Sequence, residues 1–68
     1  MAPHNVTFDP DAIRRREQDM IDNHGWLPSD INTRQHAIWT LGVDFAFDHD
    51  LWPCTVDVDV TAGRATLS

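Results

Sequence analysis

The sequence predicts an α+β fold, in which one N-terminal amphipathic helix packs on a three-stranded antiparallel sheet. Hydrophobic and polar residues alternate over residues 37–47 and 56–61, and a period of two places each set on one face of a strand. Residues 10–24 follow a helix-start signal and are ended by a glycine. The 68 residues suffice for a single small domain, which we divide into a loose arm at 1–8, a helix at 10–24 and an antiparallel sheet at 36–68.

The predicted helix begins at residues 9–11, which read Asp-Pro-Asp. Aspartate is a favoured N-cap, and proline suits the first helical position because its missing N–H would have no partner there. Gly25 supplies the left-handed conformation that ends many helices. Ahead of the helix, Val6 and Phe8 form either a short edge strand or a staple beside it. The apolar stripe of the helix consists of Ile13, Met20 and Ile21.

Residues 36–47 are the main ambiguity, because their apolar side chains also fit helical spacings of three and four. One such helical set is Ile38, Leu41 and Phe45. We favour a strand because the stretch is rich in β-branched and aromatic residues. In addition, Gly42 would destabilise a helix by about 1 kcal/mol relative to alanine.

The remaining chain is predicted to form a connection at 26–34, a strand at 55–60 and a short edge strand at 65–67. Gly63 occupies a positive-φ position in the tight turn between the two strands. Phe47 and the edge strand are where a second copy of the chain is able to add. The core that this fold predicts consists of Ile13, Met20, Ile21, Trp39, Leu41, Val43, Phe45, Val56, Val58, Val60 and Leu67.

The composition is acidic and unusual. The net charge is -6, lysine is absent, and ten of the eleven acidic residues are aspartate. Such a composition is typical of a GC-rich genome or a salt-adapted organism, such as an actinobacterium, one of its phages or a haloarchaeon. The acidity argues against binding to nucleic acid or anionic membranes, which requires a basic surface, and favours a basic protein partner.

The small size also predicts a partner. A chain of this length buries only about 60% of the surface that its unfolded form exposes. Cys54 is the only cysteine, so an internal disulfide is impossible, and assembly or docking is the remaining way to add stability. The sequence has no signal-peptide pattern and no apolar run near the roughly 20 residues of a membrane helix, so we expect the chain in the cytoplasm, or in the host cytoplasm if it is viral.

Aspartates form the first candidate interaction surface. Asp57 and Asp59 project from one side of a predicted strand, and Asp44 is expected on the same side of the neighbouring strand. Like charges placed close together on a sheet oppose folding, and a basic partner would relieve this repulsion. The alternative is that these side chains form the solvated face of an acidic protein.

The arginine run at residues 14–16 is the second candidate. Arg14, Arg15 and Arg16 lie near the start of the predicted helix, where a guanidinium is able to bind a phosphate or carboxylate of a partner. They span about 200° of the helix circumference, which prevents a single flat patch. The alternative is a solvated helix with local pairs such as Arg15 with Asp19.

Tryptophans are the third candidate. Trp26 and Trp52 lie in connections beside prolines, where full burial is difficult in so small a domain. Exposed tryptophan is typical of binding hot spots, so both are candidate interface residues. The alternative is that they cap the ends of the apolar sheet face, together with Leu27.

Histidine and cysteine residues offer only a weak metal or nucleophile pattern. His49 and Cys54 lack a recognised ligand spacing, and His24 and His36 would have to approach from elsewhere in the fold. A nucleophilic cysteine needs a base and an orienting group, so Cys54 is better interpreted as a small buried hydrophobe. We therefore expect no catalytic residue, no metal and no cofactor.

These observations favour a small acidic, non-enzymatic protein-interaction module. It would be an inhibitor or adaptor of the kind encoded by phage or accessory genes, acting by docking on a host protein. Two alternatives remain open. One is a structural subunit of a virion or other homo-oligomeric assembly. The other is a metal- or small-ligand-binding accessory subunit of an enzyme.

Overall fold

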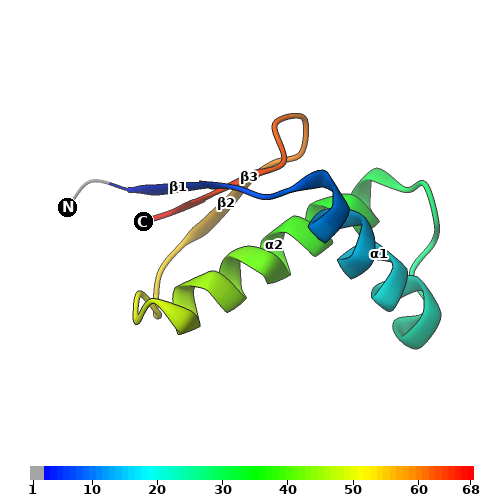
Figure 1. The fold of residues 1–68 in the computed structure, drawn as a ribbon, viewed down its shortest axis with the longest axis horizontal. Helices are drawn as coiled ribbons and strands as arrows, with labels where there is room; N and C mark the ends of the chain where they lie inside the picture. The colour runs from blue at the N-terminus through cyan, green and yellow to red at the C-terminus, as the bar shows by residue number, and fades with distance from the viewer. Residues whose placement is uncertain (1–2) are drawn as a thin grey trace.

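The computed structural model describes residues 3–68 and has an α+β fold. The chain forms β1 (His4–Thr7), α1 (Pro10–His24), α2 (Ile31–Asp48), β2 (Val56–Asp59) and β3 (Arg64–Leu67) in that order. The strands form one antiparallel sheet with the order β1-β3-β2. Helix α2 runs across one face of the sheet, and α1 packs on α2 at the far end from the two termini (Figure 1).

Helix α1 has the predicted bounds. The Asp9 carboxylate accepts a hydrogen bond from the N–H of Asp11 at 2.7 Å, as an N-cap does. At the other end Gly25 has φ +73°, and its N–H donates to the carbonyl of Met20. Ile13 and Met20 are buried, which confirms two positions of the predicted stripe.

The predicted strand at residues 36–47 is wrong, because this segment lies within helix α2. The helix begins after Asp30, whose carboxylate accepts from the N–H of Asn32 at 2.8 Å. The strand was predicted because large apolar side chains alternate along this segment, and these were expected to be buried. In the structure, however, Trp39 is 39% exposed and Phe47 is 60% exposed. The residues that face the core recur at helical spacings and are mostly small: Thr33, Ala37, Ile38, Gly42 and Ala46.

The packing around Gly42 explains why a glycine occupies the middle of a helix. A Cβ at this position would lie 3.0 Å from the Cβ of Ala65 and 3.0 Å from Cγ1 of Val56. The absence of a side chain therefore lets α2 approach β2 and β3 closely. This packing offsets the cost of about 1 kcal/mol in helix propensity that glycine has relative to alanine.

Within residues 3–68 the sheet has three strands, and its first strand is β1. This edge strand agrees with one of the two alternatives for the segment around Val6, but not with a loose arm. Strand β3 lies in the centre, so the prediction of an edge strand at 65–67 is wrong. The edges of the sheet are β1 and β2. The turn before β3 agrees with the prediction, since Gly63 has φ +64° and its carbonyl accepts from the N–H of Phe8 at 2.9 Å.

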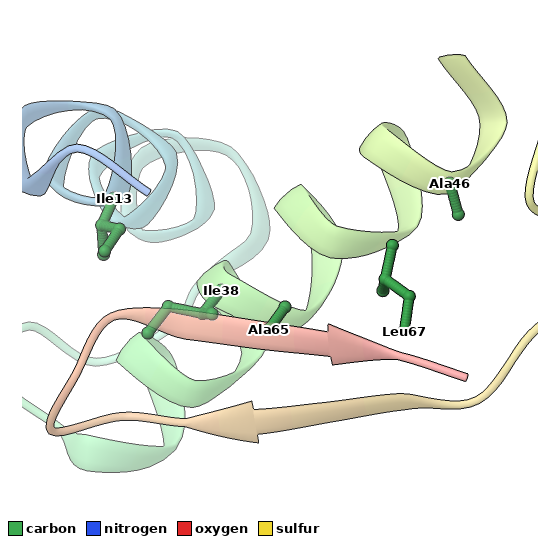
Figure 2. Packing of buried hydrophobic residues seen from close by; sticks show 5 residues of the cluster. All are labelled: Ile13, Ile38, Ala46, Ala65 and Leu67. Carbon is green, nitrogen blue, oxygen red and sulfur yellow. The ribbon is translucent and has the colours of Figure 1, made fainter. Parts of the chain in front are cut away.

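The core lies between α2 and the sheet, with a contribution from α1 (Figure 2). Ile38 and Ala46 of α2 face Ala65 and Leu67 of β3, and Ile13 closes the end near α1. Of the predicted core, three residues are buried: Ile13, Met20 and Leu67. Four others are partly buried against this cluster: Leu41, Phe45, Val56 and Val58.

Candidate functional site

An open groove of about 580 Å³ separates the N-terminal half of α2 from strand β2. Its helix side comes from one face of α2 and from the connection before that helix, and its other side comes from the edge of the sheet. The lining residues are Trp26, Asn32, Gln35, His36, Trp39, Val56, Asp57 and Val58. We call this feature the α2–β2 groove.

Three stacked rings form the helix side of the groove. The ring of His36 lies 4.6 Å from Trp26 and 5.6 Å from Trp39, with interplanar angles of 16° and 22°. His36 and Trp39 are three residues apart and therefore share a face of α2. Trp26 reaches them from the α1–α2 connection, which is held by a 2.7 Å hydrogen bond from the Thr33 hydroxyl to the carbonyl of Leu27.

Strand β2 presents its backbone edge to the groove. Val56, Asp57 and Val58 are consecutive, and neighbouring strand side chains point to opposite faces, so a groove that all three line must run along the strand's edge. Thr55 and Ser68 exchange two hydrogen bonds, of 2.8 and 2.9 Å. Bonded and non-bonded pairs alternate along an antiparallel ladder, so Val56 and Val58 direct their N–H and C=O groups away from β3.

Within residues 3–68 no strand lies beside those backbone groups, because the sheet ends at β2 on this side. An edge of this kind is a template for pairing with another extended chain. The groove thus joins an unpaired strand edge to an aromatic wall.

Charge at this edge is negative. Asp57 is the one Asp, Glu, Lys or Arg among the groove's lining residues. Asp57 and Asp59 are both exposed on the sheet face away from α2, and Asp59 pairs with Arg64 at 3.3 Å. Within the part of the chain that is described, Asp57 makes no ion pair. Asp44 does not join them, since it lies on α2; its predicted place on the sheet is wrong.

The three arginines of α1 contact separate partners. Arg14 pairs with Asp11, and Arg15 donates to the carbonyl of Asp11 at 3.3 Å rather than to the aspartate four residues on. Arg16 crosses to α2 and pairs with Asp44 at 2.6 Å. Arg16 therefore links the two helices, and the three side chains do not form one patch.

Trp52 lies apart from Trp26. Its ring stacks on Phe47 with centroids 5.1 Å apart, and it is 41% exposed. Neither Phe47 nor Trp52 lines the α2–β2 groove. Trp26 and Asp57 of the groove were predicted interface residues, whereas Trp39 was predicted in the core. Asn32 and Gln35 were assigned no role, and His36 was named only as a remote metal-ligand candidate.

A signal for the missed residues is present in the sequence. Positions 32, 35, 36 and 39 recur at helical spacing and mark one face of α2. These four positions share one face only if the segment is helical. A strand interpretation places residues 36 and 39 on opposite faces, which separates them.

Within the described residues, the histidines and the cysteine do not form a cluster that could bind a metal. No group of three or more metal-binding side chains forms within residues 3–68. His36 lies in the tryptophan stack, and the ring of His49 stacks on Phe45 at 3.9 Å. Cys54 is half-buried and packs against the core.

Comparison of the chain with protein-family models, with curated proteins and with solved structures gives no match. Within the described residues, no helix combines the length and apolar content needed to cross a bilayer.

Proposed function

We propose that this chain is a small acidic, non-enzymatic protein-interaction module that binds another protein through the α2–β2 groove. The observation that supports this proposal is the meeting of an aromatic wall and an unpaired strand edge in one groove. Strand edges and exposed aromatic side chains are two features that protein-binding sites reuse. An inhibitor or adaptor that docks on a host protein fits this description.

Energetic reasoning points the same way. Trp39 leaves 39% of its surface in water, although the rings beside it are already ordered by stacking. A partner that covers this ring gains hydrophobic free energy at about 25 cal/mol per Å² of apolar surface removed from water. Little conformational entropy is lost in doing so, because the rings of His36 and Trp39 are already stacked on α2.

Photo-crosslinking tests the proposal. A photoreactive amino acid replaces Gln35, which lines the groove, or Gln18, which is exposed on α1 and serves as the matched control. We expect a partner to crosslink from position 35 and not from position 18, and Trp39→Ala to abolish the crosslink. A partner that crosslinks from position 18 alone, or that still binds Trp39→Ala with unchanged affinity, would contradict the proposal.

A second candidate function is a subunit of a homo-oligomeric assembly. The Phe47–Trp52 pair favours it, because two large stacked rings are exposed there by 60% and 41%. Light scattering coupled to size-exclusion chromatography, over a range of concentrations, distinguishes the two. A stable oligomer that dissociates in Phe47→Ala would favour assembly, and a monomer at all concentrations would exclude it.

A further inference from the structure

We propose that the occupant of the α2–β2 groove is an extended protein segment with arginine or lysine at alternate positions, which adds to β2 as a fourth, antiparallel strand. This inference rests on the proposed function and specifies the partner's chemistry. It follows from the backbone of β2, from the charges beside it, and from the rings opposite it.

The backbone sets the conformation of the segment. Val56 and Val58 direct their N–H and C=O groups to the open edge, as the reciprocal Thr55–Ser68 bonds require. Another extended chain is able to satisfy both residues at once by continuing the ladder. A helix offers no row of free donors and acceptors, so it would leave these groups unpaired.

Side chains of an added strand would alternate between two environments. Those on the outer face of the sheet would lie beside Asp57, which makes no ion pair within residues 3–68, and beside Asp59. Directly opposed side chains of opposite charge stabilise a strand pair, so this face selects a basic residue. Those on the inner face would lie over the groove and approach Trp39, where apolar or long flat side chains fit.

A second copy of the chain fits this edge poorly. Where Val58 pairs with Val56 or Val58 of another copy's β2, Asp57 lies opposite that copy's Asp57 or Asp59, and like charges directly opposed destabilise a sheet. Strand β1, the other edge, contains no arginine or lysine to offer. The basic residue of the sheet, Arg64, lies in the central strand and already contacts Asp59. A foreign basic strand therefore matches better than self-association.

The test uses a capped, fluorescein-labelled nine-residue peptide that alternates arginine and valine, and fluorescence anisotropy with the full chain. Its charge control alternates glutamate and valine. Two further peptides carry backbone N-methyl groups, one on the valines and one on the arginines. In the proposed pairing the valines lie on the inner face opposite Val56 and Val58, so only their N–H groups donate to β2.

We expect the arginine peptide to bind and the glutamate peptide not to bind. Methylation of the valines should raise the Kd about tenfold or more, since two or more hydrogen bonds are lost, while methylation of the arginines should change it little. Equal effects of the two methylated sets, or equal binding of the glutamate peptide, would overturn the proposal. Both results are obtained with the unaltered protein, so neither depends on the folding of a variant.

Two protein variants locate the site. Asp57→Asn should weaken binding of the arginine peptide by about threefold, as expected for an exposed ion pair, and Asp22→Asn on α1 is the matched control. Gln35→Ala should weaken it as well. If the crosslinked partner depends on Trp39 but the arginine peptide does not bind, the strand-addition proposal fails while the proposed function stands.

Discussion

Gly42 of α2 lies so close to Ala65 of β3 that a Cβ placed on the glycine would be 3.0 Å from the Cβ of Ala65. The Cβ of Ala65 is fixed to the backbone of the central strand, so it cannot rotate away. This contact sets how near the helix and the sheet approach each other. It also sets the position of α2 along one side of the groove.

Substitution of Gly42 by alanine should therefore destabilise the fold. Alanine improves helix propensity by about 1 kcal/mol, but forcing a methyl group into a packed core typically costs about 1–3 kcal/mol. Because Val56 Cγ1 is also 3.0 Å away, we expect the loss to exceed the gain. Urea unfolding followed by tryptophan fluorescence measures the difference. Greater stability of Gly42→Ala than of the wild type would contradict this packing.

Two substitutions distinguish the helix that residues 36–47 form from the strand that the alternation predicted there. Ile38 is 0% exposed, so Ile38→Ala should lower the free energy of unfolding by about 2–5 kcal/mol. Trp39 is 39% exposed, and Trp39→Ala should cost clearly less than Ile38→Ala. Urea unfolding of both variants, followed by far-ultraviolet circular dichroism, gives the two values. The reverse order would support the strand.

Sequence reasoning succeeded where local signals are strong. The Asp-Pro-Asp start and Gly25 stop defined α1, and the valine alternation with Gly63 defined the β2–β3 hairpin. It failed for residues 36–47, because their helical face is built from small residues that hydrophobicity weights lightly. Gly42, for example, is buried because β2 and β3 approach it closely, and that is a tertiary contact which the sequence alone does not display.

That error had consequences for the candidate site. Treating residues 36–47 as a strand placed Trp39 in the core and Asp44 beside Asp57 and Asp59. In the structure Trp39 lines the groove, and Asp44 forms an ion pair with Arg16. Trp26 and Asp57, two of the predicted interface residues, both line the groove. They were predicted from turn residues and strand parity, which do not depend on the disputed segment.

Two substitutions of Asp30 test whether this residue caps the N-terminus of α2. Asp30→Ala removes the carboxylate that accepts from the N–H of Asn32, and loss of an N-cap typically costs about 1 kcal/mol. Asp30→Asn keeps an acceptor oxygen, so it should lower the free energy of unfolding by only about a few tenths of a kcal/mol. Thermal unfolding of the two variants measures the difference. Equal stabilities would show that Asp30 does not act as the cap.

The Arg16–Asp44 pair joins α1 to α2, and its strength is measurable by a double-mutant cycle. Arg16 and Asp44 side chains are 30% and 56% exposed, so water screens their attraction. We expect a coupling free energy of about 0.2–1 kcal/mol from Arg16→Ala, Asp44→Ala and the double variant. The coupling should shrink as salt is added, because exposed charges are screened. A coupling that salt does not change would contradict a solvent-exposed ion pair.

Hydrogen exchange of the free protein tests the open edge on which both proposals depend. Asp57 donates its N–H into the β2–β3 ladder, whereas Val56 and Val58 point theirs toward the groove, as the parity of the Thr55–Ser68 pair requires. Exchange measured by NMR should therefore be slow at Asp57 and fast at its two neighbours. Slow exchange at all three, persisting on dilution, would mean that the edge is already covered within the chain. Slow exchange that disappears on dilution would mean that a second copy covers it. Fast exchange at Val56 and Val58, at every concentration, leaves the edge available to a foreign strand.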